Sequence, residues 1–172
     1  MCRSFLKGNA MKRVYETARA VKKSIQKGKT ITLIGGHFDL LHVAHLRLLE
    51  HAKKLEDYLV VCVLSDANTQ IRKGATRPII AEGYRATLVA ALRCVDRVFV
   101  SDIDTSHQDT LSALQPSSLV FGIEDTDRWR TKSERREQFI RSLYPNINIH
   151  YLERFPDPTI STSGLIQKII GS

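Results

Sequence analysis

The chain has 172 residues, enough to bury the core of one α/β domain. Its 26 basic and 18 acidic residues give a formal net charge of +8, which favours anionic partners without distinguishing a nucleotide from a nucleic acid. The longest apolar run is far shorter than the roughly 20 residues that span a bilayer, and the first residues lack the apolar core of a secretion signal. We therefore expect a soluble, cytoplasmic protein without a membrane partner.

The three cysteines indicate a reducing compartment rather than a disulfide framework. Cys2, Cys62 and Cys94 are scattered without a Cys-x-x-Cys pair, and the last two lie inside apolar runs. Isolated cysteines of this kind are usually small buried hydrophobic side chains. We expect neither a metal site nor thiol chemistry from them.

The first predicted element is an amphipathic helix over residues 11–26, with Gly28 as its C-cap. Its apolar stripe has helical spacing and consists of Val14, Ala18, Val21 and Ile25. We predict that residues 1–29 pack in this form on a single domain spanning residues 30–172. A basic helix could also touch a membrane surface, but the narrow apolar face without tryptophan does not favour that alternative.

The most informative stretch is residues 31–54. A short apolar strand over residues 31–34 ends at Gly35-Gly36, where the chain can turn sharply. His42 and His45 then lie three residues apart where an amphipathic helix begins, so both imidazoles fall on one side of its first turn. The N-terminus of a helix attracts phosphate through its unpaired N–H groups and its dipole. The stretch therefore predicts a site for a nucleoside triphosphate.

Strand and helix patterns alternate along the rest of the chain. Strands are predicted over residues 58–64, 97–100, 118–122 and 147–152, and helices over residues 81–93, around Leu111 and Leu114, and at the C-terminus. The inward residues of the 81–93 helix are predicted to be Leu88, Ala91 and Leu92. Such alternation predicts a Rossmann-like α/β fold, with a parallel five-stranded sheet and helices on both faces.

Three further segments carry polar groups that could contact anions. Residues 71–78 form a basic, glycine-containing loop closed by Pro78, which is either an anion-contacting flap or an ordinary solvated loop. Residues 128–141 are rich in arginine, but the acidic residues among them favour a solvated helix face or a phosphate contact over a nucleic-acid footprint. The last helix begins with three hydroxyl side chains, Ser161, Thr162 and Ser163, whereas an N-cap requires only one. The run therefore predicts a second phosphate-binding helix start.

These motifs together resemble a known family. Gly36-x-Phe38-Asp39 followed by His42-x-x-His45 is similar to the signature of the nucleotidyltransferase superfamily. The spacing of the later motifs resembles its cytidylyltransferase-like branch, most closely the nucleotidyltransferase domains of bacterial ADP-heptose synthases and next the glycerol-3-phosphate cytidylyltransferases. Two departures are visible, because Ala44 replaces the family's glycine and His37 replaces a small residue or cysteine.

The resemblance implies transfer of a nucleoside monophosphate from ATP or CTP to a phosphorylated sugar or polyol, with Mg²⁺ carried on the triphosphate and pyrophosphate released. It implies catalytic roles for His42, His45 and Lys54. It implies nucleotide contacts for Gly35, Gly36, His37, Phe38, Asp39, Lys73, Arg85, Gly122, Glu124, Ser161, Thr162 and Ser163. A homodimer is expected by resemblance only. Two alternatives stay open: adenylyl transfer to a small phosphorylated cofactor, and a nucleotide-binding regulatory protein without catalysis.

Overall fold

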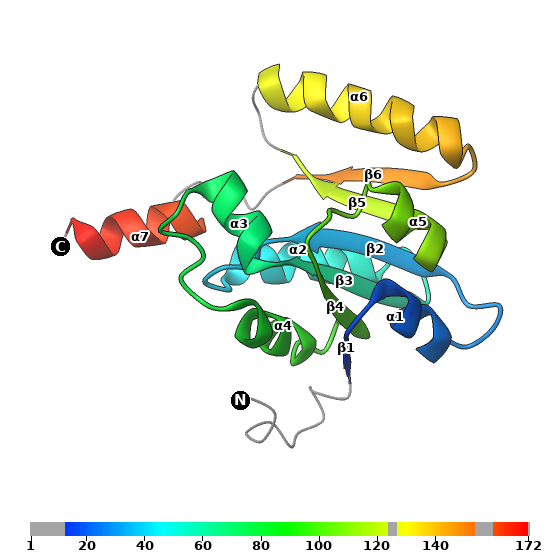
Figure 1. Ribbon diagram of the computed structural model, residues 1–172, viewed down its shortest axis with the longest axis horizontal. Coiled ribbons are helices and arrows are strands. Elements are labelled where there is room, and N and C mark those ends of the chain that lie inside the picture. Colours follow the sequence, from blue (N-terminus) through cyan, green and yellow to red (C-terminus); the bar gives the residue numbers. More distant parts are fainter. Residues whose placement is uncertain (1–12, 124–126, 154–159, 172) are drawn as a thin grey trace.

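A parallel sheet of six strands forms the centre of the protein, in the order β1-β4-β3-β2-β5-β6 (Figure 1). The computed structural model describes residues 13–123, 127–153 and 160–171. The strands are β1 (Val14–Tyr15), β2 (Ile31–Gly36), β3 (Tyr58–Leu64), β4 (Arg97–Ser101), β5 (Ser118–Gly122) and β6 (Asn148–Leu152). The predicted α/β, Rossmann-like class is confirmed, while the predicted count of five strands is one too low.

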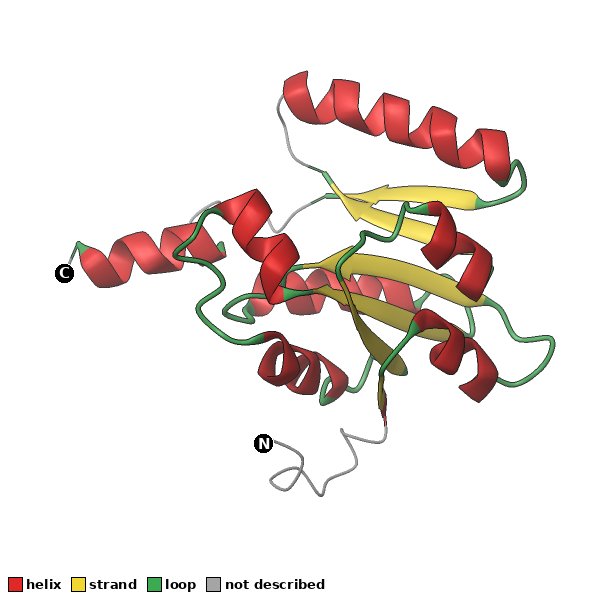
Figure 2. Ribbon diagram, viewed as in Figure 1, coloured by secondary structure: helices red, strands yellow, loops and turns green. Residues whose placement is uncertain are grey.

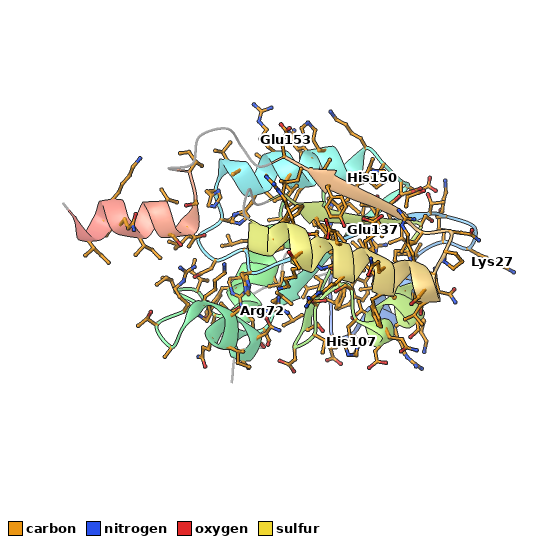
Figure 3. All side chains as sticks on the ribbon, turned by 90° about the horizontal axis from the view of Figure 1, so that it is seen from above. Lys27, Arg72, His107, Glu137, His150 and Glu153 are labelled. Carbon is orange, nitrogen blue, oxygen red and sulfur yellow. The ribbon has the colours of Figure 1, made fainter. Side chains whose placement is uncertain are left out.

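Helices cover both faces of the sheet (Figure 2). They are α1 (Ala18–Ser24), α2 (Val43–Lys53), α3 (Asp66–Lys73), α4 (Glu82–Ala90), α5 (Gln108–Leu114), α6 (Asp127–Leu143) and α7 (Thr162–Ile170). Seen from above, α6 crosses over the sheet and α7 extends away from the rest of the molecule (Figure 3). Among the described residues, no helix combines the length and apolar character needed to cross a bilayer.

Strand β3 shows how the sheet creates two cores. Its residues are almost all buried and alternate between the faces, as the two-residue period of a strand requires. Leu59, Val61 and Val63 pack with side chains from α2 and α4 on one face. Val60, Cys62 and Leu64 pack with side chains from α1, α5 and α6 on the other.

The sixth strand lies inside the segment that was predicted to be one helix. Val14 and Tyr15 pair in parallel with Val98 and Phe99 of β4, and the helix begins only at Ala18. Thr17 is its N-cap, because its hydroxyl accepts a hydrogen bond of 3.1 Å from the N–H of Ala20. The apolar spacing continued across this cap, so periodicity alone merged a strand and a helix into one element.

Two other predictions on local structure were wrong. Residues 71–73 belong to the last turn of α3, which starts from the N-cap Ser65, so the loop begins at Gly74. On α4 the buried face consists of Arg85, Ala86, Val89 and Ala90, whereas Leu88 is 44% exposed and Ala91 is exposed. The buried face is therefore rotated from the predicted one, although Leu92 packs against the core as predicted.

Candidate active site

The strand order places a topological switch point between β2 and β5. The chain leaves β2 to build β3 and β4 on one side, and then returns to place β5 on the other side of β2. In open α/β sheets, ligands bind beyond the carboxyl ends of the strands at such a point. Gly36 and Gly122 are the last residues of these two strands, so both predicted glycines lie at the expected crevice.

The turn after β2 is held tightly against its neighbours. A Cβ atom on Gly35 would lie 2.6 Å from Cγ2 of Thr105, so only glycine fits there without a shift. Phe38 and Leu40 have φ angles of 50° and 53°, in the left-handed region that L-residues rarely adopt. Phe38 is buried in the core and anchors this turn. Such a conformation persists only where the surrounding packing determines it, which is typical of binding sites.

The two histidines lie together at the start of α2. His42 is the N-cap, and its ring stacks on that of His45 with centroids 3.9 Å apart. Nδ1 of His45 accepts a long hydrogen bond of 3.4 Å from the N–H of His42. A neutral His45 that accepts at Nδ1 carries its proton on Nε2, so Nε2 is a hydrogen-bond donor. The pair thus offers a donor beside the N–H groups of the helix start.

Asp39 fixes the loop that follows α3. Its buried carboxylate accepts hydrogen bonds from the N–H groups of Ile79 at 3.0 Å and Ile80 at 3.1 Å, and it forms an ion pair of 2.6 Å with Arg77. Burial acts to raise the pKa of Asp39, but these backbone hydrogen bonds and Arg77 lower it below its ordinary value. The carboxylate therefore holds the basic loop onto the turn after β2.

Arg85 ties three segments together below the site. Its side chain is fully buried on α4 and donates to the carbonyl oxygens of Ile80 at 2.8 Å and of His37. It also pairs with the carboxylate of Asp66 at 2.7 Å. Each nitrogen of the guanidinium donates to a protein group, so Arg85 joins α4 to the turn after β2 and to the start of α3.

The start of α7 is joined directly to the turn after β2. The Thr162 hydroxyl donates a hydrogen bond to the carbonyl oxygen of Asp39, across 123 positions of the sequence. Ser161 caps the helix by accepting a 3.0 Å hydrogen bond from the N–H of Gly164, while Ser163 is exposed. The two predicted phosphate-binding helix starts are therefore neighbours in space.

The structure does not bring every predicted residue to this crevice. Lys54 is exposed beyond the last turn of α2, 12 positions after His42, or about 18 Å along the helix. This places it at the opposite end of α2 from the histidines, which argues against a catalytic role. Lys73 is exposed at the end of α3, close enough to His37 to lower its pKa. Glu124 lies outside the described residues.

Sequence reasoning missed two residues that shape the site. Thr69 on α3 forms a hydrogen bond of 2.9 Å with Nδ1 of His37, and Arg77 pairs with Asp39. The partners are 32 and 38 positions apart in the sequence, so no local pattern could have indicated either contact. The sequence carried only a weak signal for these contacts, namely that buried polar groups at strand ends need hydrogen-bond partners.

The arginine-rich helix α6 uses part of its charge inside the protein. The guanidinium of Arg136 lies 4.5 Å from the ring centroid of Phe121 on β5. Arg141 pairs with Glu137 at 2.8 Å, and Glu137 also accepts a hydrogen bond of 3.0 Å from the Tyr151 hydroxyl. These contacts attach α6 to β5 and β6.

The described residues lack the clusters of side-chain donors that commonly hold metal ions in proteins. Within the described residues, no group of three or more histidine, cysteine or acidic side chains could hold a metal. The carboxylate of Asp39, the acidic group nearest the histidines in sequence, is already engaged by Arg77 and two backbone N–H groups.

Comparison with known proteins agrees with this geometry. The profile of the cytidylyltransferase-like family matches residues 33–168, from β2 to α7. The chain belongs to this family. Family members called "Bifunctional protein HldE" are 45% identical over 105 residues in Geotalea uraniireducens, and 37% identical over 146 residues in Campylobacter fetus subsp. fetus. These alignments cover 61% and 85% of this chain but only 21% and 29% of the relatives.

Solved structures in the family's neighbourhood share the fold. The lipopolysaccharide core biosynthesis protein from Thermoplasma volcanium has a TM-score of 0.59 and 27% identity, over 74% of this chain and 99% of that one. The pantoate-beta-alanine ligase from Francisella tularensis also has a TM-score of 0.59 but is only 15% identical, over 85% of this chain and 68% of that one. The second likeness therefore shows the fold alone. The predicted family is confirmed by the profile match and the HldE relatives.

Proposed function

We propose that this protein transfers a nucleoside monophosphate from ATP or CTP to a phosphorylated sugar or polyol and releases pyrophosphate. The observation that carries the proposal is the junction of two helix N-termini at the switch point, through the hydrogen bond from Thr162 to Asp39. Each helix start presents backbone N–H groups and a positive dipole end toward phosphate. A triphosphate lying across both would be held at two of its phosphates.

The proposed reaction is an in-line displacement at phosphorus. An oxygen of the acceptor phosphate forms a bond to the α-phosphorus, the bond from that phosphorus to the bridging oxygen of the β-phosphate breaks, and pyrophosphate leaves with the electron pair. The protein contributes positioning and charge stabilisation, without a covalent intermediate. When bound, Mg²⁺ supplies positive charge to the triphosphate.

The histidine pair supplies the donor nearest the reacting centre in this proposal. Nε2–H of His45 donates to a phosphate oxygen as negative charge builds in the transition state. The stacked ring of His42 and the hydrogen bond to Nδ1 hold His45 in the required orientation and tautomer. Asp39 and Arg85 act indirectly, because their own charges are satisfied by protein partners.

A sugar or polyol acceptor is supported by sequence resemblance and by one solved structure. The motifs are most similar to those of ADP-heptose synthase domains. The Thermoplasma volcanium relative is described as a lipopolysaccharide core biosynthesis protein, and its whole length corresponds to this chain. Since this chain spans less than a third of the HldE relatives, activities located elsewhere in those proteins are not part of the proposal.

The test is pyrophosphate release by the wild type, by His45→Ala and by the matched control His51→Ala. His51 is exposed on the last turn of the same helix. Loss of a preorganised donor to developing charge costs about 10²- to 10³-fold in rate, so His45→Ala should fall by that factor while His51→Ala stays at the wild-type rate. Turnover of His45→Ala at the parent rate would refute its role. Tight ATP or CTP binding without pyrophosphate release across a broad acceptor panel would favour the non-catalytic alternative.

A further inference from the structure

His37 follows β2 directly and lies between the turn and the basic end of α3. Its backbone carbonyl accepts from Arg85, and its ring contacts Thr69 through Nδ1 at 2.9 Å. The buried Arg85 therefore fixes the backbone of His37, and the buried Thr69 fixes the direction of its ring. The family usually has a small residue or cysteine here, so the imidazole is a feature of this chain.

The hydrogen bonds of Thr69 define which ring nitrogen of His37 carries the proton. The Thr69 hydroxyl donates its single proton to the carbonyl oxygen of Ser65 at 2.8 Å. It can therefore only accept from His37, so Nδ1 carries the proton and donates. In a neutral ring this leaves a lone pair on Nε2, which makes no hydrogen bond to the described residues and is not a buried atom.

The charges around His37 restrict what can meet that lone pair. Burial and the nearby cations Lys73, Arg72, Arg85 and Arg77 lower the pKa of His37 to about 4, so the ring stays neutral at physiological pH. The same cations disfavour a metal ion or a charged amine at Nε2, because like charges repel. A neutral hydrogen-bond donor is the partner that this environment accepts.

We propose that Nε2 of His37 accepts a hydrogen bond from a hydroxyl group of a phosphorylated substrate, and thereby selects for hydroxylated ligands. The inference rests on the proposed function, because it takes the crevice to be the substrate site. The hydroxyl belongs either to the nucleotide ribose or to the acceptor, which share this chemistry.

A hydroxyl beside a phosphate fits the surroundings of His37 better than the amino group of a nucleobase. Arg72 and Arg77 are paired with Asp104 and Asp39, whereas Lys73 makes no ion pair within the described residues. Lys73 is exposed next to His37 and can meet a phosphate there. In sugar and polyol phosphates a hydroxyl lies a few bonds from the phosphate, so one ligand can reach both side chains.

The test compares matched ligands with and without one hydroxyl by isothermal titration calorimetry in the presence of Mg²⁺. The nucleotide arm uses ATP or CTP, with the 2′-deoxy and 3′-deoxy forms of each. The acceptor arm uses glycerol 3-phosphate and its two analogues that each lack one hydroxyl, 2-hydroxypropyl phosphate and 3-hydroxypropyl phosphate. Each ligand is titrated into wild type, His37→Leu, His37→Gln and the control His51→Ala. His37→Gln keeps a side-chain acceptor near Nε2, and the melting temperature of each variant verifies folding.

The expected result is a wild-type preference of about fivefold for one hydroxylated ligand, the size of a typical net hydrogen bond. The preference should vanish in His37→Leu, return in part in His37→Gln and persist in His51→Ala. The arm in which it vanishes identifies the hydroxyl.

Three outcomes would overturn the inference. They are the absence of any wild-type preference, a preference unchanged in His37→Leu, and a preference lost equally in His37→Leu and in the control His51→Ala. A His37-dependent hydroxyl preference without pyrophosphate release would instead reject the proposed transferase activity and leave the role of His37 standing.

Discussion

Replacing Asp39 by asparagine removes one charge from the site while preserving its shape. The carboxylate uses both oxygens: Oδ1 accepts from Ile79 and Ile80, and Oδ2 pairs with Arg77. An asparagine can keep its carbonyl oxygen toward the two backbone N–H groups. Its amide nitrogen then faces the guanidinium of Arg77, so two donors oppose each other where an ion pair of 2.6 Å existed.

The cost follows from the burial of this pair. The side chain of Asp39 is 1% exposed and that of Arg77 is 13% exposed, so water cannot replace the lost partner fully. Breaking a buried ion pair from one side typically costs 3–5 kcal/mol. We expect about 3 kcal/mol for Asp39→Asn, at the low end of that range, because Arg77 retains some access to solvent.

Urea denaturation of the wild type, Asp39→Asn, Arg77→Leu and the double variant measures this cost. The double variant should lose less stability than the sum of the single variants, because it leaves no unpaired charge. Asp57→Asn, which breaks the exposed pair with Lys29, is the control and should have a much smaller effect. A loss below about 1 kcal/mol for Asp39→Asn, as for an exposed pair, would refute the argument that this pair holds the loop.

The pKa shifts give two pH predictions. Because folding lowers the pKa of Asp39, its carboxylate stabilises the fold fully above the ordinary carboxyl pKa of about 3.9. That stabilisation is lost as the pH falls through the pKa of Asp39 in the folded protein. Acid should therefore destabilise Asp39→Asn less than it destabilises the wild type. For His37, ¹⁵N NMR should show a neutral ring with protonated Nδ1 down to about pH 4. An imidazolium at pH 6 would refute the argument that burial and nearby cations lower its pKa. Thr162→Val should speed hydrogen exchange at the start of α7. It should also raise KM for the triphosphate, which steady-state kinetics would detect as a lower kcat/KM. Gly35→Ala should cost about 1–3 kcal/mol in urea denaturation, and Thr105→Ser should relieve part of that cost because it removes the clashing Cγ2.

The larger features of the fold were predictable from sequence because each strand and helix carries its own pattern. The apolar run of β3 and the glycines after β2 produce their structures from neighbouring residues. The two-residue strand β1 was missed because it is too short to show a period of two, and its pairing with β4 depends on residues more than 80 positions away. Thr17 was the local signal that could have separated it from α1.

The motifs predicted where two helices begin, and less of the contacts made there. His42 and His45 stack at the start of α2, and Thr162 at the start of α7 donates to Asp39, because helix starts fall where the motifs do. The resemblance could not indicate that Asp39 and Arg85 form ion pairs with other residues of the protein, since those partners lie in distant segments. Lys54 shows the opposite failure, because a short sequence distance along a helix still moves a side chain to its far end.

The hydrogen bond from Thr162 to Asp39 also constrains when the site can form during synthesis. The ribosome makes a chain from its N-terminus at about 5–20 residues per second. The turn after β2 is made early, whereas its partner is 123 positions later, near the end of the chain described here. All six strands of the described sheet precede Thr162 in the chain, so synthesis supplies every strand before it supplies the residue that makes this contact.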